Sequence, residues 1–204
     1  MTGFSGIRDF VMDSKTASAA RYLAIMLLVF FASSMIRPLL DLNMKLAGIN
    51  NGHIGRVAMM WEAGALVGAM ALLPLLRRIS SRRLLIFCLF VFFCLVLAAP
   101  LIHTTAVSIT ARFMMGCATM LLHLTCIAGI LDVSGNRNHA TVLAVITASA
   151  SGTKALGASA VGFIGVEGSV SFFVVAALLG MAIPLACSGS IRRTRADRCI
   201  PGGL

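Results

Sequence analysis

The stretch that decides the fold is Arg77-Arg78-Ile79-Ser80-Ser81-Arg82-Arg83, which places four arginines within seven residues. Long apolar runs flank this cluster on both sides. Because clustered arginines are retained on the cytoplasmic side of a membrane, the stretch predicts a short cytoplasmic loop between two membrane-spanning helices. Placing this loop inside also sets the direction of every other span along the chain.

The composition supports an integral membrane protein. The chain of 204 residues is 59% hydrophobic and 12% charged, and its mean hydropathy is +0.97. A soluble domain is about half apolar and about a quarter charged. The net charge of +10 does not indicate nucleic-acid binding, because the basic residues fall in short clusters between apolar runs and not on one continuous basic patch. The lipid bilayer is therefore the expected partner, and no nucleic acid is expected.

Apolar runs of about 20 residues each predict six transmembrane helices, at about 22–40, 54–76, 84–102, 107–131, 139–165 and 170–187. We therefore divide the chain into a cytoplasmic N-terminal segment (1–21), a six-helix transmembrane domain (22–187) and a basic segment (188–204) that is a cytoplasmic tail or the start of a central linker. The basic residues concentrate on one side of this topology, which predicts a multi-pass protein of the plasma (inner) membrane with both termini cytoplasmic. The third span, bulky and uncharged, suits a lipid-facing helix.

Ionisable residues inside spans are candidates for a substrate or proton pathway, and here they are Glu62, Arg112, His123 and Lys154. Glu62 and Lys154 lie at similar depths, about 4 Å outward of the midplane at about 1.5 Å per residue. We expect Glu62 to pair with Lys154, or with Arg112 further out. The Glu62–Lys154 pair is either a pathway site or two charges that only neutralise each other. His123 is either a packing residue or a proton relay.

Three other patterns bear on packing and chemistry. Arg37 and Asp41 are four residues apart and share a helix face, which favours a pair at the membrane interface over a role in substrate binding. Gly64 and Gly68 form a small-xxx-small pair that lets a neighbouring helix approach closely. The fifth span carries two stripes of small residues, Ala144, Ala148 and Gly152, and Ser151, Ala155 and Ser159. The cysteines lie mostly in apolar runs without a CxxC pair, so we expect neither a metal site nor a cofactor.

These motifs together resemble the N-terminal half of a major facilitator superfamily transporter, over nearly all of 22–187. The family's loop between its second and third helices reads G-x-x-x-D-x-x-G-R-R. Here Arg82 and Arg83 match its closing basic pair, whereas Ser81, Arg78 and Pro74 stand at the family's Gly, Asp and Gly positions. Arg112 and Gly116 match the family's R-x-x-x-G signature in the fourth helix, whose arginine is associated with proton transfer in proton-coupled members. The fifth span is glycine-rich, as in the family, but lacks the antiporters' Gly-Pro pair.

The resemblance implies an all-α membrane fold of two inverted three-helix repeats, which is half of a major facilitator transporter. It also implies a secondary active transporter that moves a small solute by alternating access, with protons as the candidate coupling ion, and not an enzyme. The chain would be a fragment, a truncated frame or a half that works with a missing C-terminal six-helix half or a second copy. A structural membrane subunit and an intramembrane enzyme, the latter from S-x-x-K at Ser151 and Lys154, are the alternatives.

Overall fold

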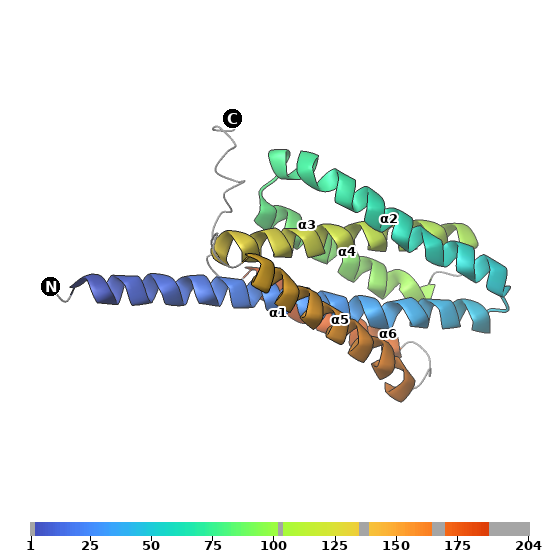
Figure 1. The fold of residues 1–204 in the computed structure, drawn as a ribbon. Helices are drawn as coiled ribbons and strands as arrows, with labels where there is room; N and C mark the ends of the chain where they lie inside the picture. Colours follow the sequence, from blue (N-terminus) through green and yellow to red (C-terminus); the bar gives the residue numbers. More distant parts are fainter. Residues whose placement is uncertain (1–2, 102–103, 135–138, 165–169, 188–204) are drawn as a thin grey trace.

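The computed structural model describes residues 3–101, 104–134, 139–164 and 170–187, and all regular secondary structure within them is helical. Figure 1 shows the helices in chain order. They are α1 (Gly3–Leu46), α2 (Asn51–Arg78), α3 (Ser81–Ala98), the short 3-10 helix η1 (Ala99–Leu101), α4 (Thr105–Ser134), α5 (His139–Ile164) and α6 (Val170–Cys187). The six predicted helices are therefore present at the predicted places. The predicted basic segment 188–204 lies outside the described residues.

The first helix differs from its predicted limits at both ends. It begins at Gly3, so the predicted N-terminal segment is part of one long helix with the first span. It also continues to Leu46, beyond the predicted limit at residue 40, so that Asp41 lies on the helix. The turn that follows contains Gly48, whose φ of 77° suits glycine because it has no Cβ. Asn50 then caps α2 by accepting a hydrogen bond from the Gly52 amide.

Four helices in the described part of the chain are long and apolar enough to span a membrane. Their spanning stretches are Ala17–Leu46, Asn51–Arg78, Ser81–Ala98 and Ala106–Val133. The stretch Phe172–Cys187 in α6 is apolar but shorter. In α5, small and hydroxyl-bearing residues together with Lys154 replace bulky apolar side chains, which lowers its hydropathy. Four of the six predicted spans therefore meet the length and hydropathy of a transmembrane helix by themselves.

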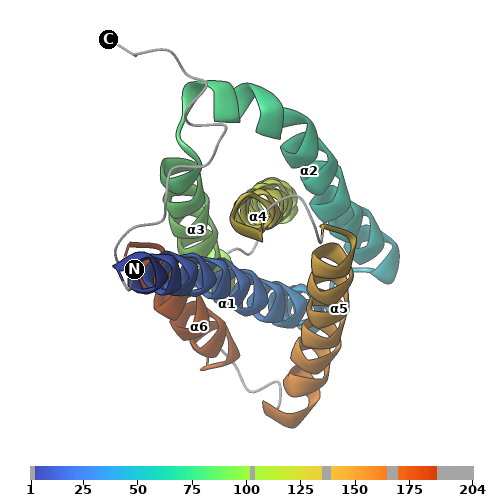
Figure 2. The ribbon, with the colours of Figure 1, turned by 60° about the vertical axis from the view of Figure 1, so that its left-hand side comes forward.

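Two helices, α1 and α4, form the centre of the bundle and pack against each other. Figure 2 shows α4 enclosed by α1, α2 and α3, with α5 and α6 on the far side of α1. The main contacts follow the same arrangement: α4 packs on α2 and α3, α1 packs on α5 and α6, and α3 packs on α6. The core consists of apolar side chains between these helices, among them Ile25, Met35, Phe92, Leu122 and Leu179.

Glycines set the close approach of α2 to α4. A Cβ on Gly64 would meet the backbone carbonyl of Phe113, and a Cβ on Gly116 would meet that of Trp61. A Cβ on Gly68 would lie 2.6 Å from the carbonyl oxygen of Cys117. The predicted role of Gly64 and Gly68 in close helix packing is therefore confirmed, because any larger side chain would push the two backbones apart.

The small-residue stripes of α5 lie on exposed faces of the helix. Ala144, Ala148 and Gly152 are exposed, as are Ser151, Ala155 and Ser159, and a Cβ on Gly152 would meet nothing within 4 Å. The residue that brings α5 onto α1 is Gly157, where a Cβ would meet Ser34 and the carbonyl oxygen of Phe31. Helical spacing identified small faces on α5, but it could not show which of them meets α1.

The arginine cluster is not a loop, because most of it belongs to helix ends. Arg77 and Arg78 form the last turn of α2, only Ile79 and Ser80 link the helices, and Arg82 and Arg83 lie in the first turn of α3. The Arg82 guanidinium donates a hydrogen bond of 2.7 Å to the carbonyl oxygen of Cys187 at the end of α6. Cations are favoured at a helix C-terminus, so Arg82 stabilises the end of α6.

Candidate functional site

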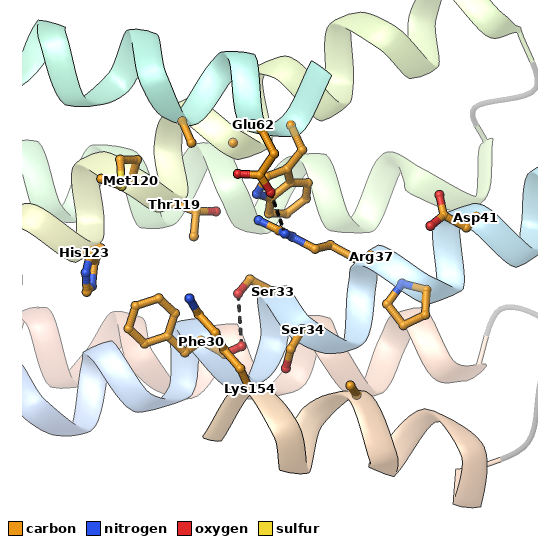
Figure 3. A pocket seen from close by; sticks show the side chains of 15 residues that line it. Phe30, Ser33, Ser34, Arg37, Asp41, Glu62, Thr119, Met120, His123 and Lys154 are labelled. Carbon is orange, nitrogen blue, oxygen red and sulfur yellow. Dashed lines mark hydrogen bonds and ion pairs between the residues drawn. The ribbon is translucent and has the colours of Figure 1, made fainter. Parts of the chain in front are cut away.

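A cavity of about 620 Å³ lies among four helices, and it collects most of the ionisable residues that the sequence places inside spans. Figure 3 shows its lining side chains. Those from α1 are Phe30, Ser33, Ser34, Arg37, Pro38 and Asp41; those from α2 are Trp61, Glu62 and Ala65; those from α4 are Gly116, Thr119, Met120 and His123; and those from α5 are Lys154 and Ala158. No lining residue comes from α3, as expected for the predicted lipid-facing helix.

Glu62 forms an ion pair across the cavity, but not with the expected partner. Its Oε1 lies 2.8 Å from Nη1 of Arg37, so the pair connects α2 to α1 (Figure 3). The guanidinium also lies over the Trp61 ring, 4.5 Å from its centroid, a cation–π contact that holds Arg37 in place. The predicted pairs of Glu62 with Lys154 or Arg112 are therefore wrong. Equal depth in the membrane does not make two helices face each other.

Asp41 forms the second ion pair, with Arg112. Asp41 Oδ1 lies 2.7 Å from Nη1 of Arg112, and this joins α1 to α4. Asp41 lines the cavity, whereas Arg112 lies behind it with only 3% of its side chain exposed. The predicted pairing of Arg37 with Asp41 is therefore also wrong, because each bonds to a different helix. Gly116, one turn after Arg112, does admit a neighbouring helix, as expected.

Lys154 and His123 both lie against Phe30. The Lys154 Nζ is 4.6 Å from the centroid of the Phe30 ring, and the His123 ring meets the same ring edge-on at a centroid distance of 4.6 Å. The two residues come from α5 and α4 and face one cavity (Figure 3). In the described part of the chain, Lys154 has no carboxylate within ion-pair distance. It therefore brings a positive charge to the cavity that no described side chain balances.

The hydroxyl groups of the cavity are bonded to their own helices. Ser33 donates to the Phe30 carbonyl, Ser34 to the Phe31 carbonyl and Thr119 to the Met115 carbonyl, at 2.7 to 3.0 Å. Such back-bonding is usual for hydroxyls in membrane helices. These oxygens can still accept hydrogen bonds, but their protons are occupied. The donors left for a bound solute therefore include Lys154, the remaining N–H groups of Arg37 and the ring of His123, whose Nδ1 has no hydrogen-bond partner among the described residues.

The structure thus brings together Glu62, His123 and Lys154, and it places Arg112 just behind them as the partner of Asp41. Sequence analysis missed Arg37 and Asp41 as cavity residues because their helical spacing also fits a simple interfacial pair. Among the residues that the structure describes, no group of three or more His, Cys, Asp or Glu side chains could hold a metal ion. The structure also describes no hydrogen bond between Ser151 and Lys154, which the enzyme alternative would require.

A cavity lined by Arg, Lys, Asp and Glu side chains and lying among apolar helices can hold a polar solute inside a membrane. It offers one balanced cation–anion pair across its width, a second pair at its edge, and one unbalanced ammonium group.

Two comparisons with known proteins bear on the kind of protein that contains this cavity. No curated protein matches the chain. The family model described as Major Facilitator Superfamily matches residues 22–198. Since this match covers most of the chain, the protein belongs to the Major Facilitator Superfamily, whose members are membrane transporters.

Proposed function

We propose that the chain is one half of a secondary active transporter, which moves a small solute across the membrane by alternating access. The observation that carries this proposal is the cavity of about 620 Å³, whose ionisable residues come from α1, α2, α4 and α5. Transporters of this architecture bind solutes near the midplane between two repeats or halves. The other half would be a missing C-terminal six-helix half or a second copy of this chain, and the exposed small residues of α5 suit close contact with it.

The packing of the helices supports two inverted three-helix repeats. If α1, α2 and α3 are exchanged with α4, α5 and α6, the set of main packing pairs is preserved. The pair α2 on α4 becomes α5 on α1, the pair α3 on α4 becomes α6 on α1, and the pairs α1 with α4 and α3 with α6 map onto themselves. The glycine contacts obey the same exchange. Gly64 of α2 meets the Phe113 carbonyl on α4, and Gly157 of α5 meets the Phe31 carbonyl on α1. Repeats of this kind allow one site to open alternately to each side.

The proposed setting is the plasma (inner) membrane, with both termini and the arginine cluster on the cytoplasmic side. Protons are the proposed coupling ion, because Glu62 and His123 line the cavity and both side chains can exchange protons. A structural subunit would not need an accessible cavity of this size. The distinction between transporter and scaffold therefore depends on whether the cavity is reached from both sides of the membrane.

Cysteine labelling tests this directly. In a cysteine-free background, Ala65→Cys places a thiol in the cavity lining, and Ala118→Cys places one in the core, where the alanine is 5% exposed. The variants are treated with a membrane-impermeant maleimide in right-side-out and inside-out vesicles. We expect Ala65→Cys to react in both orientations and Ala118→Cys to react only after denaturation. Reaction of Ala65→Cys in one orientation alone would contradict alternating access and favour the scaffold.

A further inference from the structure

Counted with Arg112 just behind the wall, the charged side chains of the cavity are three cations, Arg37, Arg112 and Lys154, and two anions, Asp41 and Glu62, so one positive charge is left over. The two carboxylates each have an arginine partner, since Glu62 binds Arg37 and Asp41 binds Arg112. Lys154 is the remaining lysine or arginine in the lining, and no described carboxylate lies within ion-pair distance of it. Lys154 is exposed to the cavity, so its ammonium group is accessible to a bound anion, which would supply the missing counter-charge. The charge balance therefore favours a negatively charged solute.

The hydrogen-bonding groups point to the same kind of ligand. The lining hydroxyls of Ser33, Ser34 and Thr119 donate to backbone carbonyls, so they offer no free proton to an acceptor. Lys154 has three N–H donors, and one face of its ammonium lies against Phe30. A carboxylate could therefore bind the other side of the ammonium. A cationic solute would face both Lys154 and Arg37, and the carboxylates of Glu62 and Asp41 already have arginine partners.

The remaining lining is apolar or aromatic. Phe30 and Trp61 present rings, and Ala65, Met120 and Ala158 present small or flexible apolar surfaces. Gly157, next to Ala158, permits the close contact of α5 with α1 that carries Lys154 to the Phe30 ring. A solute that consists of one anionic group on an apolar body would satisfy both parts of the cavity, the ammonium and the rings.

We propose that Lys154 anchors a small monovalent organic anion, a carboxylate on an apolar body, which lies in the cavity between Phe30 and Trp61. This assignment rests on the proposed function, because it makes the cavity the solute site of a transporter. Lys154 is then the residue that selects anions over neutral solutes of the same shape. A charge-assisted hydrogen bond to a carboxylate corresponds to about tenfold or more in affinity.

Trp61 is the single tryptophan of the chain and lies in the cavity lining, so its fluorescence reports binding there. The purified chain is titrated with benzoate and with benzamide, which share a flat ring and differ in charge. We expect benzoate to change the fluorescence saturably and to bind at least tenfold more tightly than benzamide. Lys154→Gln should remove this preference, Lys154→Arg should keep it, and the matched control Lys45→Gln, an exposed lysine outside the cavity, should leave it unchanged.

A second measurement needs no variant. Acylation of Lys154 by an amine-reactive reagent, followed by mass spectrometry, should slow in the presence of benzoate but not of benzamide, while acylation of Lys45 stays constant. The proposal is overturned if benzoate has no effect in either measurement, if it binds no better than benzamide, or if its preference survives Lys154→Gln. These results do not depend on alternating access. A transporter of neutral solutes would still label Ala65→Cys from both sides and would fail only here.

Discussion

Neutralising Asp41 tests whether the Asp41–Arg112 pair contributes more to the free energy of unfolding than the more exposed Arg37–Glu62 pair. The pairs are almost equally short, 2.7 Å for Asp41–Arg112 and 2.8 Å for Arg37–Glu62. However, Arg112 has 3% of its side chain exposed, whereas Arg37 and Glu62 have 46% and 67% exposed. Asp41→Asn would leave the guanidinium of Arg112 buried without its counter-charge. Glu62→Gln would leave Arg37 beside Trp61 and open to the cavity.

Breaking a fully buried ion pair by removing one partner costs about 3–5 kcal/mol. Because Asp41 is 41% exposed, water screens one side of this pair, and we expect a smaller loss of about 2–3 kcal/mol for Asp41→Asn. For a chain of this length, that loss corresponds to a fall of about 5–10 °C in the melting temperature. Exposed pairs contribute about 0–1 kcal/mol, so Glu62→Gln should lower the melting temperature by less than about 4 °C.

The assay is thermal unfolding of the purified variants in one detergent, followed by light scattering and by Trp61 fluorescence. The double variant Asp41→Asn/Arg112→Met removes both charges of the buried pair and should be more stable than Asp41→Asn alone, because no uncompensated guanidinium remains. Equal losses for Asp41→Asn and Glu62→Gln would refute the argument from burial. Strictly additive losses in the double variant would show that Asp41 and Arg112 do not interact.

Two further predictions concern packing and topology. Gly64→Leu and Gly116→Leu should each prevent α2 from packing on α4, because the new side chain would meet backbone atoms and not a movable side chain. Both variants should therefore lose the monodisperse peak in size-exclusion chromatography. The control Gly152→Leu should keep this peak, because there is open space beside Gly152. Reporter fusions after Arg83 should be cytoplasmic and those after Asn51 external, so an external signal after Arg83 would contradict the inside assignment of the arginine cluster.

The sequence by itself determined the class of the protein and the positions of its helices. Apolar runs broken by turn residues and arginine clusters are local signals, and each can be read along one segment without knowledge of its neighbours. The ends of α2 through α6 accordingly lie within a few residues of their predicted limits. The long continuation of α1 to both sides was not predicted, because polar helical residues beyond a span carry no comparable hydropathy signal.

Only the tertiary structure decided which charges meet. The rise of about 1.5 Å per residue gives the depth of Glu62 and Lys154, but not the direction in which each side chain points. That direction depends on the rotation and tilt of whole helices, which the glycine contacts of Gly64, Gly116 and Gly157 set. As a result Glu62 faces Arg37 on α1, while Lys154, held by α5, reaches Phe30 without a carboxylate partner among the described residues. Depth is encoded along the chain, whereas partner choice arises from the packing of segments that are distant in sequence.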